Sequence, residues 1–510
     1  MESQGAIVLF RRDLRLDDNA ALGAACARGG PVVPCFVWSP EEDGSWAPGA
    51  AARWWLHHSL GALDASLGER GARLVIRRGP TREALEGLVE ETGARAVYWS
   101  RSCEPARAAA DVDLADALRA GGIETRSFAG ALLAEPASVR KKDGSPYRVF
   151  TPFFRTFLAR VRAGAPARPP REIPFPAAAP ESLRREALEL LPRVDWTAGL
   201  RAAWTPGEAG AATAWKRFLA RAADKYAQAR DVPGIAGTSR LSPHLHFGEI
   251  SVRRMWRDAA RRRKGAPAAR AAGIDAYVRQ LVWREFAHHV LWHFPRTPDD
   301  PLQIAFARFP WASAPAEREA WQRGRTGYPI VDAGMRELWA TGWMHNRVRM
   351  IVASFLVKHL RVSWQEGARW FWDTLVDADL ANNTFGWQWA AGCGADAAPY
   401  FRIFNPELQG RKFDPEGAYV RRWVPELAVL PARWIHAPWR APAEALCAAG
   451  VELGRTYPAP IVEHAAARAG ALAALAAMRK GSRQTGSGGG GSNGTPNALE
   501  RRLAEMRPDS

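Results

Sequence analysis

The sequence predicts an α/β unit with a doubly wound parallel sheet, followed by an all-α unit. Short apolar runs alternate with amphipathic segments up to about residue 132, whereas the pattern from about residue 206 to 480 is helical and dense in tryptophan. The chain has 510 residues, which exceeds what a single hydrophobic core usually organises. Two domains are therefore expected.

Four apolar runs are expected to form buried strands of the N-terminal sheet. They are AIVLF, VVPCFVW, RLVIRR and AVYWS, at residues 6–10, 32–38, 73–78 and 96–100. The segments between them, such as TREALEGLVEETG, have helical periodicity. The first strand is followed by FRRDLRLDD and not by GxGxxG, so a dinucleotide site of the usual kind is not expected there.

The domain boundaries follow from changes in composition. After an α/β domain over residues 1–132, residues 133–205 are rich in Pro, Ala and Arg without a sustained period, which predicts a long surface connection. A helical domain is expected over 206–480. Residues 481–510 contain GSGGGGS and are expected to form a flexible tail.

Charge and cysteine usage narrow the class of protein. The formal net charge is +17, with 70 Lys and Arg against 53 Asp and Glu, which indicates either a polyanionic partner such as nucleic acid or an Arg-rich proteome. The five cysteines lie far apart without a CxxC, so no metal site and no disulfide scaffold is expected, and a reducing cytoplasm is favoured. No apolar run is long enough to cross a membrane.

The segment GTSRLSPHLHFGEIS has the chemistry of an anion site. Ser242 before Pro243 is typical of an N-cap followed by the first residue of a helix, and Thr238 and Ser239 add hydroxyl groups beside the positive helix end. A pyrophosphate would suit this place. An ordinary capped helix is the alternative.

Two helical segments place indole beside guanidinium. They are YVRQLVWREFAHHV and GWMHNRVRMIVASFLVKHL, at 277–290 and 342–360. Such pairs stack on flat rings or bases and hold phosphate, although a single tryptophan more often fills a core. The side chains in question are Gln280, Trp283, Arg284, Asn346, Arg347, Arg349 and Met350.

The segment VDADLANNTFGWQWA combines paired carboxylates, amides and indoles. Asp377 and Asp379 precede a predicted helix on which Trp387 and Trp389 project to roughly opposite faces. One ring is therefore expected to face the interior while the other faces a cavity.

Together with FRRDLRLDDN, these segments resemble the signatures of the photolyase/cryptochrome flavoproteins, and the resemblance extends to about residue 465. It implies an N-terminal antenna domain, a helical domain that binds a U-shaped FAD, and light-driven repair of pyrimidine dimers in DNA by a cytoplasmic monomer. By the same resemblance, the FAD phosphates are held by Tyr226, Thr238, Ser239, Arg240, Leu241 and Ser242. The isoalloxazine is then surrounded by Arg349, Asp377, Ala378, Asp379 and Asn383.

The resemblance also implies an electron-transfer chain from Trp387 through Trp364 to Trp311, with a flipped lesion held between Trp283 and Trp389. An amide at flavin N5, the place assigned to Asn383, favours a repair enzyme, since plant cryptochromes carry a carboxylic acid there. The expected contacts to lesion and DNA are Arg230, Gln280, Trp283, Arg284, Asn346, Arg347, Met350, Trp389, Arg402 and Gln409.

The type of lesion and the second chromophore follow less directly from the resemblance. Asn346 and Met350 stand where (6-4) photolyases use histidine, which favours cyclobutane dimers, whereas Gln280 matches the (6-4) enzymes. Arg107 replaces the acidic residue of the bacterial folate contact, so a folate in another pocket, a deazaflavin or no antenna chromophore remain open. A (6-4) photolyase, a blue-light-sensing cryptochrome and a plain helical nucleic-acid binder are the alternative functions.

Overall fold

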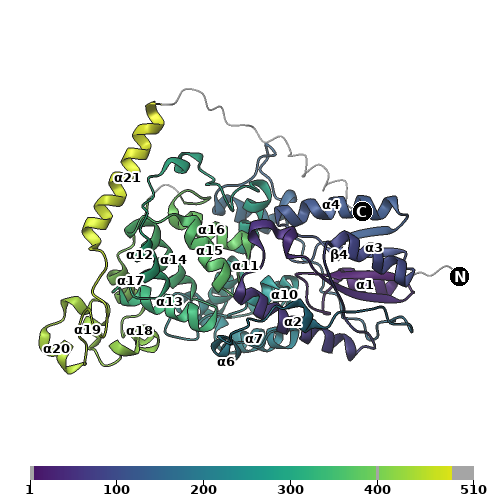
Figure 1. Ribbon diagram of the computed structural model, residues 1–510, viewed down its shortest axis with the longest axis horizontal. Coiled ribbons are helices and arrows are strands. Elements are labelled where there is room, and N and C mark those ends of the chain that lie inside the picture. Colours follow the sequence, from purple (N-terminus) through teal and green to yellow (C-terminus); the bar gives the residue numbers. More distant parts are fainter. Residues whose placement is uncertain (1–4, 398–400, 485–510) are drawn as a thin grey trace.

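A five-stranded parallel sheet forms the N-terminal part of the computed structural model, which describes residues 5–397 and 401–484. The strand order is β3-β2-β1-β4-β5, so that the chain winds outward in both directions from β1. The sheet lies at one end of the molecule (Figure 1). The strands are β1 (Ala6–Phe10), β2 (Val32–Trp38), β3 (Val75–Arg78), β4 (Ala96–Ser100) and β5 (Glu124–Phe128). The predicted doubly wound parallel sheet is confirmed.

The edge strand β5 was not among the predicted strands. Its sequence ETRSF alternates exposed and buried side chains, because an edge strand in this position shows one polar face to solvent. Continuous apolar runs indicate only strands that are buried on both faces, so they do not indicate β5.

Helices cover both faces of the sheet. Ala6, Val8 and Phe10 of β1 pack in one core with α1 and α2, whereas Ile7 and Leu9 pack in another with α3 and α4. The alternation follows from the period of two along a strand. The bounds of these helices are α1 (Ala20–Ala27), α2 (Ala50–Gly68), α3 (Thr81–Thr92) and α4 (Pro105–Ala120).

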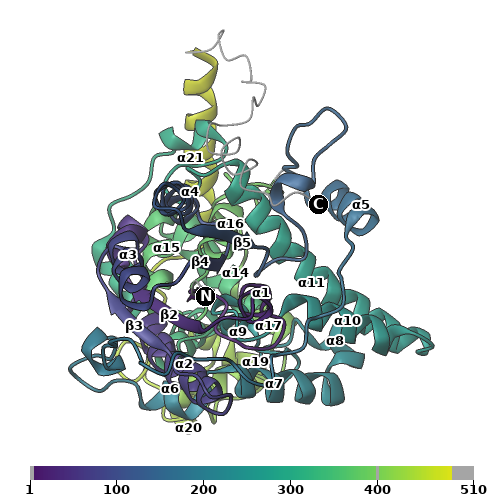
Figure 2. The ribbon, with the colours of Figure 1, turned by 90° about the vertical axis from the view of Figure 1, so that its right-hand side faces the viewer.

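Among the described residues, the second part of the chain consists of helices and loops with one isolated β-bridge between Leu453 and Tyr457, and it contributes the largest hydrophobic core. Helix α11 is the longest, and Figure 2 shows α10 and α11 beside the sheet domain. Helix α21 lies at the end of the molecule away from the sheet (Figure 1) and packs on the π-helical turn η6 (Phe355–His359). The bounds are α7 (Glu208–Arg221), α8 (Tyr226–Ala229), α9 (Ser242–His246), α10 (Val252–Arg263), α11 (Ala268–His293), α12 (Pro315–Gln322), α13 (Pro329–Thr341), α14 (Asn346–Ser354), α15 (Trp364–Thr374), α16 (Leu380–Ala391), α17 (Pro406–Phe413), α18 (Ala418–Trp423), α19 (Ala432–Ile435), α20 (Ala443–Ala448) and α21 (His464–Gln484).

The connection between the two domains contains regular structure that its composition did not predict. Helix α5 (Phe150–Arg160) packs its aromatic side chains on α11, and α6 (Ala198–Ala203) contacts α13. The expected long connection over residues 133–205 therefore includes these two short helices, and its role as the link between the domains stays a prediction. Helix α21 also runs to Gln484, four residues into the expected tail of 481–510, and the rest of that tail lies outside the described residues.

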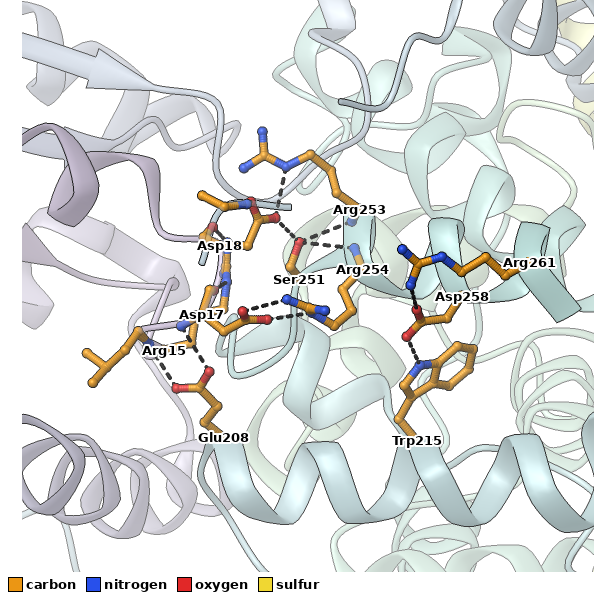
Figure 3. Close-up of polar contacts among 12 residues, drawn as sticks. Arg15, Asp17, Asp18, Glu208, Trp215, Ser251, Arg253, Arg254, Asp258 and Arg261 are labelled. Atoms are coloured by element: carbon orange, nitrogen blue, oxygen red, sulfur yellow. Dashed lines mark hydrogen bonds and ion pairs between the residues drawn. The ribbon is translucent and has the colours of Figure 1, made fainter. Parts of the chain in front are cut away.

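The segment RDLRLDD, which follows β1, joins the two domains (Figure 3). Asp17 receives two bonds from Arg254 of α10, and Asp18 contacts Arg253 and Ser251 at the start of the same helix. Glu208 of α7 accepts the backbone N–H groups of Leu16 and Asp17. The motif after β1 therefore holds the helical domain against the sheet.

Arg15 is the buried centre of this joint. Its guanidinium donates to the carbonyl oxygens of Asp17, Asp18, Gly130 and Gly248. Gly248 has φ of 68°, and a Cβ there would lie 2.0 Å from the Arg12 carbonyl oxygen, so only glycine permits this close approach.

Candidate functional site

One large cavity of about 730 Å³ opens in the helical domain. Its volume falls within the range of about 300–1,000 Å³ that is typical of ligand pockets. Of the predicted site residues, its walls contain Tyr226, Arg230, Thr238, Ser239, Arg240, Leu241, Ser242, Gln280, Trp283, Arg284, Asn346, Arg347, Arg349, Met350, Asp377, Asp379, Asn383, Trp387, Trp389 and Arg402. The predicted residues Trp311, Trp364, Ala378 and Gln409 are not part of this wall.

Arg240 places a half-buried positive charge in the cavity wall. Its guanidinium lies between the rings of Trp204 and Trp343, with Cζ 4.3 and 4.9 Å from their centroids. Its φ of 54° is left-handed, a conformation that few non-glycine residues adopt. Burial lowers the pKa of the guanidinium, and its buried Nε has no hydrogen-bond partner within the described part of the chain. An anionic ligand group would satisfy this donor.

Hydroxyl groups surround the same end of the cavity. The hydroxyl of Tyr277 donates to Ser239, and burial raises the pKa of Tyr226 to about 12, so both phenols stay protonated. Helix α9 begins at Ser242 with Leu241 as its N-cap, one residue earlier than predicted, and Ser242 Oγ accepts the indole N–H of Trp343.

Arg349 and Asp377 form an ion pair in the middle of the wall. Arg349 Nη2 donates to both carboxylate oxygens of Asp377, at 3.0 and 2.8 Å. Its Nε donates to the carbonyl oxygen of Met344 at 2.8 Å, which fixes the plane of the guanidinium. The pair brings together α14 and the segment that precedes α16.

Asp379 caps helix α16 and remains ionised. Its Oδ1 accepts the backbone N–H of Asn382 at 2.8 Å, while Oδ2 lies 3.4 Å from His288 Nε2 and 3.7 Å from His246 Nδ1. Burial by itself would raise the pKa of Asp379, but these two imidazoles hold it well below its usual value. One carboxylate thus serves the helix end and the cavity wall together.

Asn383 follows one turn later on α16. Its Nδ2 donates to the carbonyl oxygen of Ala368 at 3.0 Å, which leaves Oδ1 as the acceptor that the side chain can offer to a ligand. The residue lines the cavity.

Trp387 is 2% exposed and contributes to the cavity wall. Its ring meets Phe371 edge-on with centroids 5.0 Å apart, and a Cβ at Gly367 would lie 2.2 Å from it, so α15 can approach this closely only with glycine. Trp364 begins α15 and is buried in the same core, whereas Trp311 is half-buried on Phe309. Electron transfer along these three indoles stays a prediction.

The two indoles predicted to hold a lesion both line the cavity. Trp283 on α11 stacks face to face on Phe150, with centroids 3.5 Å apart and planes 6° apart. Trp389 on α16 is half-buried, and the guanidinium of Arg402 lies 6.0 Å from its ring centroid. One face of Trp283 is therefore already occupied by the protein.

The predicted phosphate-binding arginines differ in whether their guanidinium groups already bind other groups of the protein. Arg284 donates to the Ala131 carbonyl oxygen, and Arg347 pairs with Asp231 at 3.0 Å, whereas Arg402 is exposed. Arg230 lies 3.7 Å from Asp231. Gln280, Asn346 and Met350 line the cavity, and Gln409 lies on α17.

A buried lysine in the wall was not singled out from the sequence. Lys358 Nζ donates to the Ala391 carbonyl oxygen at 2.6 Å and lies 3.0 Å from the Phe401 ring centroid, and burial holds its pKa well below the usual value. Lys358 follows Met350 and Ser354 at intervals of four residues, which places all three on one face of a helix. The assignment of Met350 to the site could therefore have pointed to Lys358.

A second cavity of about 110 Å³ lies between the domains, and Ala378, Asp379 and Arg107 contribute to its wall. Arg107 is tied to Asp43 and Glu42 by bonds of 2.6 and 2.7 Å. This volume is below the usual range for a ligand pocket. The identity of a second chromophore stays open.

Comparisons with known proteins agree with this arrangement. Residues 6–174 match a family model described as DNA photolyase, and residues 277–477 match the FAD binding domain of DNA photolyase. A deoxyribodipyrimidine photo-lyase from Agrobacterium fabrum is 49% identical over 94% of this chain and 99% of its own length. Cryptochrome-1 from Arabidopsis thaliana is 41% identical over 93% of this chain and 70% of its own length.

The fold has a solved counterpart. The crystal structure of a bacterial class III photolyase from Agrobacterium tumefaciens superposes with a TM-score of 0.91 at 48% identity, covering 94% of this chain and 98% of that one.

Proposed function

The chain belongs to the photolyase/cryptochrome family, and on this basis we propose that it is a DNA photolyase that splits cyclobutane pyrimidine dimers in a light-dependent reaction with FAD. One observation carries the proposal. A single cavity joins the residues expected around the flavin, such as Arg349 and Asn383, to the two indoles expected around the lesion, Trp283 and Trp389. Electron transfer between the two ligands requires this closeness.

The residues present fit FAD. The unsatisfied Nε of Arg240 and the hydroxyl groups of Ser239 and Thr238 suit the pyrophosphate, and the cavity is large enough for a dinucleotide. At the other end, the carboxylate of Asp379 suits an N–H on the edge of a flat ring, and Asn383 Oδ1 suits a second one. Bound FAD supplies the photoexcited electron that splits the dimer.

The chain's own contribution is positioning and electrostatics. The Arg349–Asp377 pair is neutral as a unit and holds a guanidinium beside the ring site without adding net charge. The indoles of Trp283 and Trp389 offer flat apolar surfaces to extruded bases, and base stacking on an aromatic ring contributes about 1–3 kcal/mol. Flipping costs a few kcal/mol, and least for a damaged, poorly paired base.

Asn346 and Met350 support the cyclobutane assignment. Both line the cavity, and neither can transfer a proton as a histidine would. Gln280 can still donate to and accept from the carbonyl and N–H groups of a thymine pair.

The net charge of +17 fits a DNA substrate, and the five free cysteines fit a reducing cytoplasm. No helix within the described part of the chain is long and apolar enough to cross a membrane. One chain provides every residue of the proposed site, so we propose that a cytoplasmic monomer is the active form.

The test uses the purified holoprotein with chemically reduced flavin. It is illuminated with blue light on oligonucleotides that carry either a cyclobutane dimer or a (6-4) product, with a dark control. We expect light-dependent repair of the cyclobutane dimer alone, retained in Gln280→Glu. Repair of only the (6-4) product would reassign the lesion, and repair of neither would favour a cryptochrome-like light sensor.

A further inference from the structure

Phe150 covers one face of the cavity indole Trp283. The two rings are nearly parallel at 6°, with centroids 3.5 Å apart, and Phe150 is 1% exposed. Phe150 is the first residue of α5 and belongs to the connection between the domains. Since an aromatic ring has two faces, a flipped base can stack only on the face of Trp283 that Phe150 leaves open.

Phe150 is itself held from several sides. Its backbone N–H donates to Asp396 Oδ1 at 3.0 Å, and the backbone N–H of Asp396 donates to the Arg148 carbonyl oxygen at 3.0 Å. The guanidinium of Arg279 lies 4.7 Å from the Phe150 ring centroid. Arg279, Phe150 and Trp283 therefore form three layers behind the cavity.

The three layers come from two different helices. Arg279 and Trp283 lie on successive turns of α11, whereas Phe150 enters between their side chains from α5. Asp396 follows α16, lines the cavity and has a left-handed φ of 55°. The helix that carries Trp389 and the helix that carries Trp283 are thus connected through Phe150.

We propose that Phe150 is a positioning residue for lesion binding, which fixes the Trp283 indole in the orientation that an extruded base requires. This inference rests on the proposed function, because it assumes that Trp283 stacks on the lesion. An indole that is already immobilised loses less conformational entropy when a base stacks on it. A substitution of Phe150 that lets the indole move should therefore weaken lesion affinity, although Phe150 itself does not contact the DNA. Such a substitution should leave the rate of the chemical step unchanged.

Phe150→Leu removes the flat ring and keeps an apolar side chain. We expect the Kd and KM for a cyclobutane-dimer oligonucleotide to rise about three- to tenfold, as expected for restoring the freedom of one side chain. The turnover at saturating lesion, the flavin content and the affinity for undamaged DNA should not change. Phe154→Leu is the matched control, because Phe154 lies on the same helix and packs under Arg279 and against Phe150. It should leave all five quantities unchanged.

A double-mutant cycle with Trp283→Ala separates positioning from general structure. If Phe150 acts through Trp283, Phe150→Leu should cause no further loss of lesion affinity in the Trp283→Ala background. An equal loss in both backgrounds, or no loss in the parent background, would overturn the inference. If Phe150→Leu does not retain flavin, the same cycle is measured with Phe150→Met, which has a flexible side chain of similar size.

The same cycle distinguishes this inference from the proposed function. Loss of lesion affinity in Trp283→Ala but not in Phe150→Leu would overturn the role of Phe150 alone. Unchanged lesion affinity in Trp283→Ala would overturn the lesion site, and the role of Phe150 with it.

Discussion

Asp17 and Arg254 form a two-bond ion pair across the domain interface, with Oδ2–Nε and Oδ1–Nη2 distances of 2.6 Å (Figure 3). Asp17 follows the first strand of the sheet, whereas Arg254 lies in the first turn of α10 in the helical domain. The paired geometry fixes both the distance and the plane of the contact. It holds α10 against the segment after β1 and so helps to fix the two domains relative to each other.

Asp17→Asn should weaken this joint. Both side chains are partly exposed, so the loss in the free energy of unfolding should be about 1 kcal/mol. Urea unfolding of the parent and the variant measures it. The control is Asp116→Asn, which removes an exposed pair with Arg119 inside α4 and should change stability by less. Equal effects of the two substitutions would argue against a special role for the interface pair.

Asp377→Ala should reduce the amount of FAD that the purified protein retains. The substitution leaves the partly exposed Arg349 guanidinium without its carboxylate, and the loss in stability should stay below the value of about 3–5 kcal/mol that is typical of a fully buried pair. The flavin-to-protein absorbance ratio measures the occupancy. Asp373→Ala, close by in the sequence, removes a contact to the N-terminus of α2 and should retain flavin. Undiminished occupancy in Asp377→Ala would remove Asp377 from the cofactor site.

Trp387→Phe should abolish photoreduction of oxidised FAD, because a phenyl ring is much harder to oxidise than an indole. Repair should survive if the flavin is reduced chemically beforehand. Absorbance changes under blue light with an external reductant measure the rate, and Trp256→Phe on α10 provides a control substitution of the same type. Photoreduction at the parental rate would contradict the chain of Trp387, Trp364 and Trp311.

Binding to duplex DNA should weaken steeply with salt. Each phosphate contact contributes about −0.9 to the slope of log K against log salt, so Arg402→Ala, which removes an exposed guanidinium at the rim, should make the slope shallower by about 0.9. Arg82→Ala on the outer helix α3 of the sheet domain should not alter it. If the DNA affinity of the parent protein did not depend on salt, the net charge of +17 would reflect an Arg-rich composition and not DNA binding.

Acid should destabilise the protein through buried neutral histidines, of which His289 is the clearest. Its Nε2 accepts the backbone N–H of Tyr147 at 3.0 Å, and burial lowers its pKa to about 3. Because the folded-state pKa lies below the unfolded value of about 6.5, the unfolded chain binds the proton first, and stability is lost as the pH falls from about 6.5 toward 3.

At pH 4.5 this linkage amounts to about 2–3 kcal/mol. His289→Gln is uncharged throughout and keeps an acceptor for the Tyr147 N–H, so it should be less stable than the parent at pH 7.5, with the difference shrinking by about that amount at pH 4.5. Urea unfolding at the two pH values measures it. A difference that is independent of pH would show that His289 is not the titrating group.

Local sequence patterns determined much of this molecule. The apolar runs placed four strands of the sheet, because parallel strands are buried on both faces and need continuous apolar sequence. The segment LANNTFGWQWA was expected to be helical and forms α16, and the structure shows that Asp379 caps its start. The resemblance carried by the motifs also located many of the residues that line the main cavity, on loops such as 238–241 as well as on helices.

Contacts between distant segments were decided only by the tertiary structure. The stacking of Phe150 on Trp283, the pairing of Asp17 with Arg254 and the burial of Lys358 against Phe401 each join residues far apart in the chain. No local period encodes such a contact, since it depends on how whole helices pack and on which small residues, such as Gly367 and Gly248, allow them to approach. The sequence therefore specified the elements and the chemistry that each carries, and close packing decided which face of Trp283 stays open to a ligand.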